Sequence, residues 1–285
     1  MKLALRIYLT ILTTIFILGM FLEYRQDYSK ERVLWKIEND FDKISDPGSS
    51  ENEFIVKKII NRYQSFIKKN AKTQFNPKAQ LELANVFVTQ NRYQEARDIY
   101  EDVINKFKIN PEIVAKAEYA LAQSYEKENN WPKAVTIYRS IIREYPITST
   151  GFSIPYYLGS FYLIRGLNST ASTAFTEASE FYQNIASSYP DSPLGYSSLQ
   201  MLIKSYLALG NWTDALYAAK QLLFQYPLAP TLTDTIFLIR DIGLKKLKNT
   251  DLILTIYKDF IDKNKGHPIN STLEKIIHRI SPERT

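Results

Sequence analysis

The stretch NNWPKAVTIYRSIIREYP, residues 129–146, has a counterpart further along the chain, GNWTDALYAAKQLLFQYP, residues 210–227. Both have Asn-Trp at their second and third positions, place an Ala three residues after the Trp, and end in Tyr-Pro. In the first stretch the apolar or small residues at 134, 137, 138, 141 and 145 lie on one face of an α-helix. A helix with one apolar face needs a partner to cover that face, and the repetition indicates that the partner is another copy.

The similarity extends to whole helix–turn–helix units. Residues 83–107 and 121–146 superpose without a gap, and residues 202–227 follow the same spacing. Each unit has a first helix, a short turn with Asn or Gly, and a second helix before the next unit. Small residues occupy the positions where the two helices of a unit should cross: Ala84, Ala96, Ala122, Ala134 and Ala215. Prolines end three of the units: Pro146, Pro190 and Pro227.

This spacing resembles the tetratricopeptide repeat (TPR), a helix–turn–helix unit of roughly 34 residues. The unit at 121–146 is the most similar, and the following unit needs a second helix about two turns longer than usual, ending near Tyr189. A fifth unit, residues 228–268, is degenerate, because Asp241 stands where a small residue is expected. The resemblance implies an all-α protein, an α-solenoid of about five stacked TPR-like repeats over residues 76–268. A single transmembrane helix is expected to precede the solenoid.

The expected transmembrane helix is the N-terminal apolar segment. No charged residue occurs from Ile7 to Leu22, and residues 3–22 are long enough as a helix to cross the roughly 30 Å hydrocarbon core of a bilayer. A cleaved signal peptide is the alternative, but no small-x-small cleavage site follows the apolar run. The sequence therefore predicts an uncleaved anchor in residues 1–22, with the N-terminus inside and the remainder translocated.

Two short regions separate this anchor from the repeats. Residues 23–50 should form a juxtamembrane helix to about Ser45 and then a linker, because the sequence DPGSS at 46–50 cannot continue a helix. Residues 51–75 should form a helix that leads into the array. Residues 269–285 are expected to be a C-terminal cap and tail.

Composition argues against several kinds of site. The chain has no Cys, only two His and few Gly, so we expect no metal site, no cofactor and no phosphate-binding loop. No nucleophile–base pair or paired carboxylates stand out, and the sequence predicts a protein that is not an enzyme. The net charge of +6 comes from the two ends of the chain, which is not the concentrated basic face that nucleic-acid binding requires.

The layout is similar to that of two groups of bacterial envelope TPR scaffolds. One is the TPR lipoprotein of outer-membrane β-barrel assembly, which shares junctions like Tyr189-Pro190-Asp191-Ser192-Pro193 but has a lipobox Cys that is missing here. The other is the ancillary subunit of the inner-membrane translocon, with one N-terminal span and a periplasmic TPR domain. The resemblance implies an inner-membrane scaffold that binds protein partners in the periplasm, for envelope protein assembly or translocation. Two alternatives are a cytoplasmic-facing adaptor that regulates a membrane enzyme, and a glycan-binding protein or enzyme.

A candidate binding surface lies in residues 147–227, where charged residues are rare and tyrosines are frequent. Loss of charge together with gain of Tyr is typical of protein-binding surfaces, but it also fits the interior of the array. If the segment binds a partner, the concave positions of the family on the first helices should carry the contact, with Tyr156 as the anchor. These partner-binding candidates are Ser153, Tyr156, Ser160, Leu163, Ser197, Gln200 and Lys204.

Overall fold

The computed structural model describes residues 2–281, except for some side chains of the first helix. Those side chains belong to residues 2–7, 10–11, 18–19 and 21–26. Every regular element within the described residues is a helix, which confirms the all-α class. The chain divides into two compact units, Met1–Gly151 and Phe152–Thr285, so the predicted array of residues 76–268 contributes to both.

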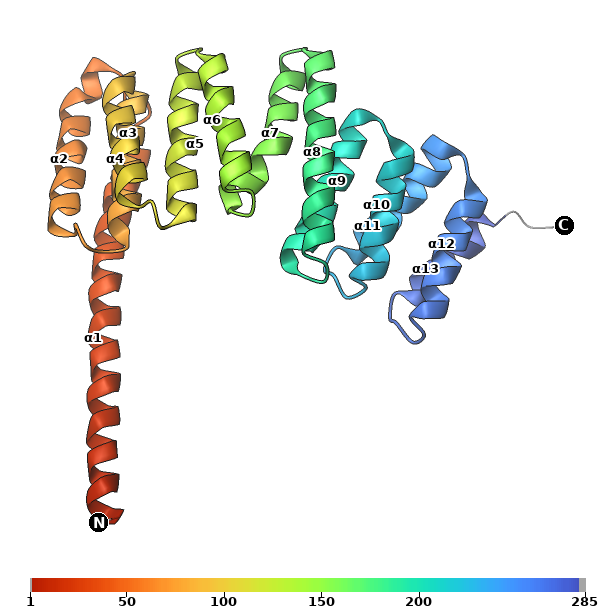
Figure 1. Ribbon diagram of the computed structural model, residues 1–285, viewed down its shortest axis with the longest axis horizontal. Coiled ribbons are helices and arrows are strands. Elements are labelled where there is room, and N and C mark those ends of the chain that lie inside the picture. The colour runs from red at the N-terminus through yellow and green to blue at the C-terminus, as the bar shows by residue number, and fades with distance from the viewer. Residues whose placement is uncertain (1, 282–285) are drawn as a thin grey trace. The chain divides into compact units, whose positions relative to one another are not determined.

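The first unit is built of antiparallel helices joined by short turns (Figure 1). Its elements are α1 (Lys2–Asp42), the 3₁₀ helix η1 (Ser50–Asn52), α2 (Glu53–Lys69), α3 (Phe75–Thr89), α4 (Tyr93–Lys106), α5 (Pro111–Lys127) and α6 (Trp131–Glu144). From α2 to α6 each helix packs against its neighbour in sequence, and α1 packs against α2 and α3. The packed part of α1 is its C-terminal end, where Leu34 and Ile37 are buried.

The N-terminal half of α1 extends beyond the other helices of the first unit (Figure 1). Its described large apolar side chains are exposed: Tyr8, Leu9, Leu12, Ile15, Phe16, Ile17 and Met20. Among the described residues, no helix is long and apolar enough to cross a membrane. The expected anchor, residues 3–22, includes many side chains outside the described set, and it stays a prediction.

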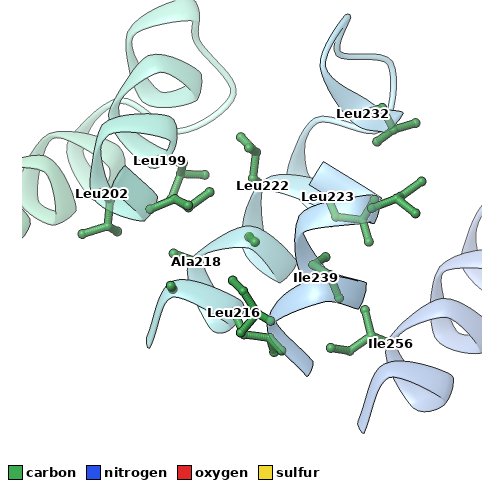
Figure 2. Close-up of a cluster of buried hydrophobic side chains, with 14 of the residues drawn as sticks. Leu199, Leu202, Leu216, Ala218, Leu222, Leu223, Leu232, Ile239 and Ile256 are labelled. Carbon is green, nitrogen blue, oxygen red and sulfur yellow. The ribbon is translucent and has the colours of Figure 1, made fainter. Parts of the chain in front are cut away.

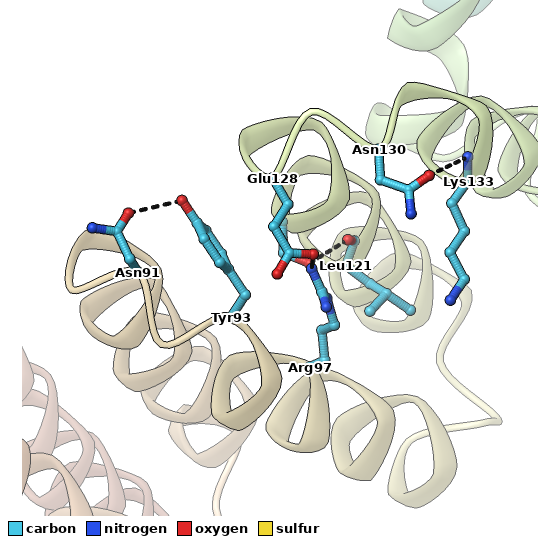
Figure 3. Close-up of polar contacts among 8 residues, drawn as sticks. Asn91, Tyr93, Arg97, Leu121, Glu128, Asn130 and Lys133 are labelled. Carbon is cyan, nitrogen blue, oxygen red and sulfur yellow. Dashed lines mark hydrogen bonds and ion pairs between the residues drawn. The ribbon is translucent and has the colours of Figure 1, made fainter.

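The turns inside the hairpins use residues in the left-handed conformation. Four of these residues have φ between 59° and 72°: Asn91, Asn129, Gly166 and Gly210. Asn and Gly adopt this conformation at lower cost than other residues, which explains the Asn and Gly of the sequence pattern. After one such turn Asn130 caps α6, because its Oδ1 accepts a hydrogen bond from the backbone N–H of Lys133 at 3.4 Å (Figure 3).

The small residues predicted at the helix crossings are fully buried. Five alanines have 0% exposure: Ala84, Ala96, Ala122, Ala134 and Ala215. An alanine at a crossing lets two helix axes approach to about 8–10 Å. The burial of these alanines therefore confirms the alignment of the repeated units at these positions. An alignment shifted by one residue would instead have put a larger or charged side chain, such as Lys133 or Asp214, at the crossing.

A buried tyrosine ties the two helices of several hairpins together. Tyr100 Oη donates to Asn85 Oδ1 at 2.9 Å, and Tyr138 Oη donates to Glu126 Oε2 at 3.0 Å. The same position in the unit that begins with α7 (Ser149–Ile164) holds Phe175, a ring without a hydroxyl. Burial raises the pKa of Tyr100, so its hydroxyl stays protonated and remains a donor.

A buried arginine joins two successive hairpins of the first unit (Figure 3). The Arg97 side chain, on α4, is 8% exposed, and its Nε donates to Ser124 Oγ of α5 at 3.1 Å. Its Nη2 pairs with the carboxylate of Glu128, and its Cζ lies 3.9 Å from the centre of the Tyr125 ring. Hydrogen bonds and a cation–π contact together satisfy a charge that would be costly to bury alone.

The second unit continues the pattern of hairpins (Figure 1). Its elements are α7, α8 (Asn168–Ser188), α9 (Pro193–Leu209), α10 (Trp212–Gln225), α11 (Leu232–Asp241), the π-helix η2 (Ile242–Leu247), α12 (Thr250–Lys263) and α13 (Asn270–Ile280). Helix α8 has 21 residues, whereas α10 has 14, which confirms the longer second helix expected in that unit. At the C-terminus α13 packs against α12 and buries Leu273.

One continuous apolar cluster holds the second unit together (Figure 2). Leu199 and Leu202 of α9 belong to this cluster together with Leu222 of α10 and Ile239 of α11. These four side chains are at most 4% exposed. Each helix of the cluster buries its apolar stripe against the next, as stacked repeats require.

Two glycines lie close to the backbone of the Tyr-Pro turn that precedes them. A Cβ added to Gly151 would lie 2.0 Å from the carbonyl oxygen of Tyr145, and one added to Gly195 would lie 2.2 Å from that of Tyr189. In both cases the glycine follows the tyrosine by six residues, in YPITSTG and YPDSPLG. The third Tyr-Pro turn has Leu232 at this position, so a glycine makes this close approach only at the first two turns.

The degenerate fifth hairpin corrects one expectation. Asp241 does not occupy the crossing; it forms ion pairs with Arg240 and Lys245, both at 2.8 Å. The close approach is made instead by Gly243, where an added Cβ would lie 2.4 Å from the Ile253 side chain. The π-helix η2 contains Gly243, and its wider turn changes the register on which the alignment depended.

Candidate protein-binding site

The seven predicted partner-binding residues lie on α7 and α9, the first helices of two hairpins in the second unit. They differ in exposure. Three are exposed: Ser153, Leu163 and Lys204. Four are half-buried: Tyr156, Ser160, Ser197 and Gln200. A surface that binds a partner needs accessible side chains, so the two groups have to be considered separately.

Tyr156, the expected anchor, packs within its own hairpin. Its ring lies against Phe175 of α8, with the ring centroids 5.3 Å apart, and it borders the apolar cluster of the second unit. Close by, a Cβ added to Gly159 would lie 2.5 Å from the Phe175 ring, so α7 and α8 are tightly packed here. Replacing Tyr156 would therefore remove packing as well as any contact with a partner.

Three of the polar candidates have their hydrogen bonds inside the unit. Gln200 Nε2 donates to Tyr196 Oη at 3.0 Å and to Thr231 Oγ1 at 3.3 Å. The hydroxyls of Ser160 and Ser197 donate to backbone carbonyls one turn earlier in their own helices. Gln200 thus supports the start of α11, and the exposed members Ser153, Leu163 and Lys204 are better placed to contact a partner.

The exposed apolar surface near Leu163 belongs to the turn between α7 and α8. Leu163, Ile164 and Leu167 are 47%, 84% and 50% exposed. Many other large apolar residues of segment 147–227 are buried in the cluster of the second unit, among them Tyr182 and Leu222. The scarcity of charged residues in this segment is therefore explained in large part by the burial of its side chains in the interior.

A cavity that the sequence analysis missed lies between two turns of the second unit. It has a volume of about 510 Å³ and is lined by the α8–α9 turn and the α10–α11 turn. We call it the Tyr-Pro cavity, and its lining consists of Asp191, Ser192, Pro193, Tyr196, Gln225, Tyr226, Pro227, Leu228, Ala229 and Pro230. A volume of this size is in the range of small-molecule and peptide sites.

Two tyrosines that line the Tyr-Pro cavity pack against each other. The rings of Tyr196 and Tyr226 meet edge to face, with centroids 5.3 Å apart and an interplanar angle of 70°. Tyr226 Oη donates to the Ser192 carbonyl at 3.2 Å, and the Tyr196 hydroxyl is hydrogen-bonded to that of Thr231. Burial raises the pKa of Tyr226, so the hydroxyl stays protonated and holds the two turns together.

A repeated motif signals this cavity in the sequence. Residues 189–193 read YPDSP and residues 226–230 read YPLAP, so both turns have proline one and four residues after tyrosine. The first Tyr-Pro turn reads YPITS at residues 145–149 and lacks the second proline. The motif alone could not show that two such turns lie side by side, because they belong to different hairpins.

The described residues offer no obvious place for a metal ion, since nowhere among them do three or more His, Asp or Glu side chains gather. The expectations that the protein is not an enzyme and binds no cofactor stay predictions from the sequence. What the arrangement of this unit can do is bind: it presents an exposed apolar turn, an exposed cation on α9 and a cavity lined by aromatic and proline rings.

One family model and two solved structures show what this chain is similar to. Residues 60–112 and 81–146 match the family model of the tetratricopeptide repeat. A tetratricopeptide repeat protein from Parabacteroides merdae ATCC 43184 is 15% identical, with a TM-score of 0.36 over 88% of this chain and 99% of that chain. BtubC (BKLC) from P. vanneervenii is 13% identical, with a TM-score of 0.40 over 90% of this chain and 95% of that chain.

No curated protein matches the sequence. At these identities and TM-scores, neither solved structure assigns a function to this chain. The matched segment runs from within α2 through the end of α6, where the buried alanines and the Asn turns were found. Residues 60–146 thus match the tetratricopeptide repeat, and the described part of the second unit is likewise built of helical hairpins.

Proposed function

We propose that this chain is a membrane-anchored scaffold whose TPR-like hairpins bind another protein in the bacterial envelope. The observation that carries the proposal is the match of residues 60–146 to tetratricopeptide repeats, because stacked hairpins of this kind present extended surfaces for partners. The binding surface in this proposal is the concave face, with Ser153, Leu163 and Lys204 as its accessible members. Fold alone does not name the partner.

Membrane attachment is supported by the sequence of residues 3–22 and by the exposure of α1. Ile15, Phe16 and Ile17 are 62%, 67% and 65% exposed, and no charged residue interrupts the run from Ile7 to Leu22. Apolar surface of this extent is unfavourable in water and favourable in hydrocarbon. Lys2 and Arg6 precede the run and can reach the headgroups at its N-terminal side.

The proposed orientation has the N-terminus in the cytoplasm and both helical units in the periplasm. Protease added to intact spheroplasts is expected to digest the helical units, because they would be exposed outside the inner membrane. A cytoplasmic marker protein in the same sample should stay intact. If the units are digested only after the spheroplasts are lysed, the protein faces the cytoplasm and the adaptor function becomes the better proposal.

Site-specific photo-cross-linking in cells tests the binding surface. A photo-reactive amino acid placed at Leu163, or at Lys204, should give a discrete adduct with a partner protein, because both side chains are exposed on first helices. The matched control is the same amino acid at Ile109, which is 98% exposed but lies in the turn between α4 and α5 of the first unit. Equal adducts from Ile109, or none from Leu163 and Lys204, would refute binding through this surface.

A further inference from the structure

We propose that the Tyr-Pro cavity is a second binding site, which accepts an extended proline-rich peptide segment carrying a lysine or arginine. This site is formed by turns between hairpins, and none of the predicted partner-binding residues lines it. The proposal goes beyond the scaffold function and holds whether or not α7 and α9 bind a partner.

The lining of the cavity matches the surface of a proline-rich segment. Three prolines, two tyrosines, Leu228 and Ala229 supply most of the wall. Proline-rich segments adopt the polyproline II helix, which aromatic-lined grooves bind through ring contacts. Leu228 is 86% exposed beside these rings, so a ligand would cover an apolar side chain that now faces water.

The two tyrosine hydroxyls of the cavity already have hydrogen-bond partners within the second unit. Tyr196 Oη is hydrogen-bonded to Thr231 and accepts from Gln200, and Tyr226 Oη donates to the Ser192 carbonyl. A ligand that required many hydrogen bonds from the wall would have to break these contacts. Polyproline II segments suit such a wall, because their backbone has no internal hydrogen bonds and is solvated.

The cavity is preorganised by the glycine at the start of α9. A Cβ added to Gly195 would lie 2.7 Å from Tyr226 Oη, so the missing side chain leaves room for this hydroxyl. The edge-to-face contact of Tyr226 with Tyr196 then fixes both rings. A wall whose rings are held before binding loses little conformational freedom when a ligand arrives.

Charge decides which proline-rich segment fits. Among the described residues that line the cavity, Asp191 is the only one that is charged at neutral pH, and it is exposed at the rim. Its Oδ1 accepts a hydrogen bond from the neutral amide of Gln225 at 3.4 Å. A lysine or arginine beside the prolines of the ligand would complement this carboxylate, whereas an acidic residue would be repelled.

Fluorescence anisotropy on the purified full-length chain tests the proposal. The probe is a labelled oligoproline peptide ending in one arginine, and we expect it to bind the wild type. Leu228→Ser should weaken binding about tenfold by removing apolar contact, which corresponds to about 1.4 kcal/mol. The matched control is Ile164→Ser, an equally exposed apolar residue of the same unit (84%), which should leave binding unchanged.

Asp191→Asn separates charge from shape. Asn keeps the size of the side chain and tolerates the left-handed backbone of this residue, where φ is 57°. This variant should lower the affinity for the arginine peptide several-fold, because an exposed ion pair contributes only modestly to binding. The affinity for an oligoproline peptide without arginine should not change. A Gly-Ser peptide with the same arginine should bind neither the wild type nor the Asp191→Asn variant.

Several results would overturn the inference. The first is that the wild type does not bind the arginine peptide. The second is that Ile164→Ser weakens binding as much as Leu228→Ser does. The third is that the wild type binds the Gly-Ser peptide as tightly as the oligoproline peptide. Sedimentation of the peptide-free protein adds one more: a concentration-dependent dimer that Leu228→Ser abolishes would identify a second copy of the chain as the occupant. Melting temperatures of the variants confirm that each one is folded.

Discussion

Ala215→Trp is expected to destabilise the second unit by about 3 kcal/mol, at the upper end of what overpacking of a core usually costs. Ala215 is 0% exposed on α10, in the apolar cluster shared with α9, so an indole ring could be accommodated only by separating the helices. Thermal unfolding followed by circular dichroism measures the loss. Ala134→Trp should have a similar effect in the first unit, since Ala134 occupies the matching position on α6.

Tyr217→Trp is the matched control, because Tyr217 lies on the same helix and is 52% exposed. Its effect should stay within about 0.5 kcal/mol, as for most surface substitutions. Hydrogen exchange should place the loss of protection in Ala215→Trp mainly around α9 and α10, since stacked repeats contact only their neighbours. Wild-type melting of both tryptophan core variants would show that the crossings are assigned incorrectly.

Gly195→Ala should destabilise the second unit by about 2 kcal/mol. The added Cβ would lie 2.2 Å from the carbonyl oxygen of Tyr189, and a backbone atom cannot rotate away as a side chain can. Alanine has a higher helix propensity than glycine, by about 1 kcal/mol, but overpacking against backbone outweighs this gain. Urea unfolding should show the loss as a lower midpoint with an unchanged slope.

Gly210→Ala provides a contrasting control for this glycine. Nothing lies within 4 Å of a Cβ at Gly210, whose φ is 69°, so the cost comes only from the left-handed backbone, about 1 kcal/mol. The variant Gly151→Ala should resemble Gly195→Ala, because its Cβ would meet the Tyr145 carbonyl at 2.0 Å. If Gly195→Ala proved as stable as the wild type, the close approach of α9 to the preceding turn would be disproved.

The hairpins themselves could be predicted from the sequence, because their causes are local. The spacing of the apolar positions, the Asn or Gly turns and the alanines at crossings are all properties of short stretches of chain. Ala134 and Ala215 are fully buried as expected, and Asn129 takes the left-handed conformation that its turn requires. Repetition strengthened each of these predictions, because every unit tested the same pattern again.

The surroundings of the candidate site residues could not be predicted from the sequence. Tyr156 was expected to be an accessible anchor, yet its ring packs against Phe175, and Gln200 supports Thr231 at the start of α11. Sequence position told which helix carries these residues but not which neighbouring side chain covers them. The exposure of members such as Lys204 also depends on these neighbours, and their role in binding stays a prediction.

Tertiary structure alone decided the features that join separate hairpins. The Tyr-Pro cavity exists because the turns at 191–193 and 225–230 lie side by side, and the motif in either turn gives no information about the other. Likewise Gly243 replaces Asp241 at the last crossing because a π-helix shifts the register. Periodicity along the chain determines which side of each helix is buried. The side chains that pack against that side come from elements distant in sequence, so only the tertiary structure identifies them.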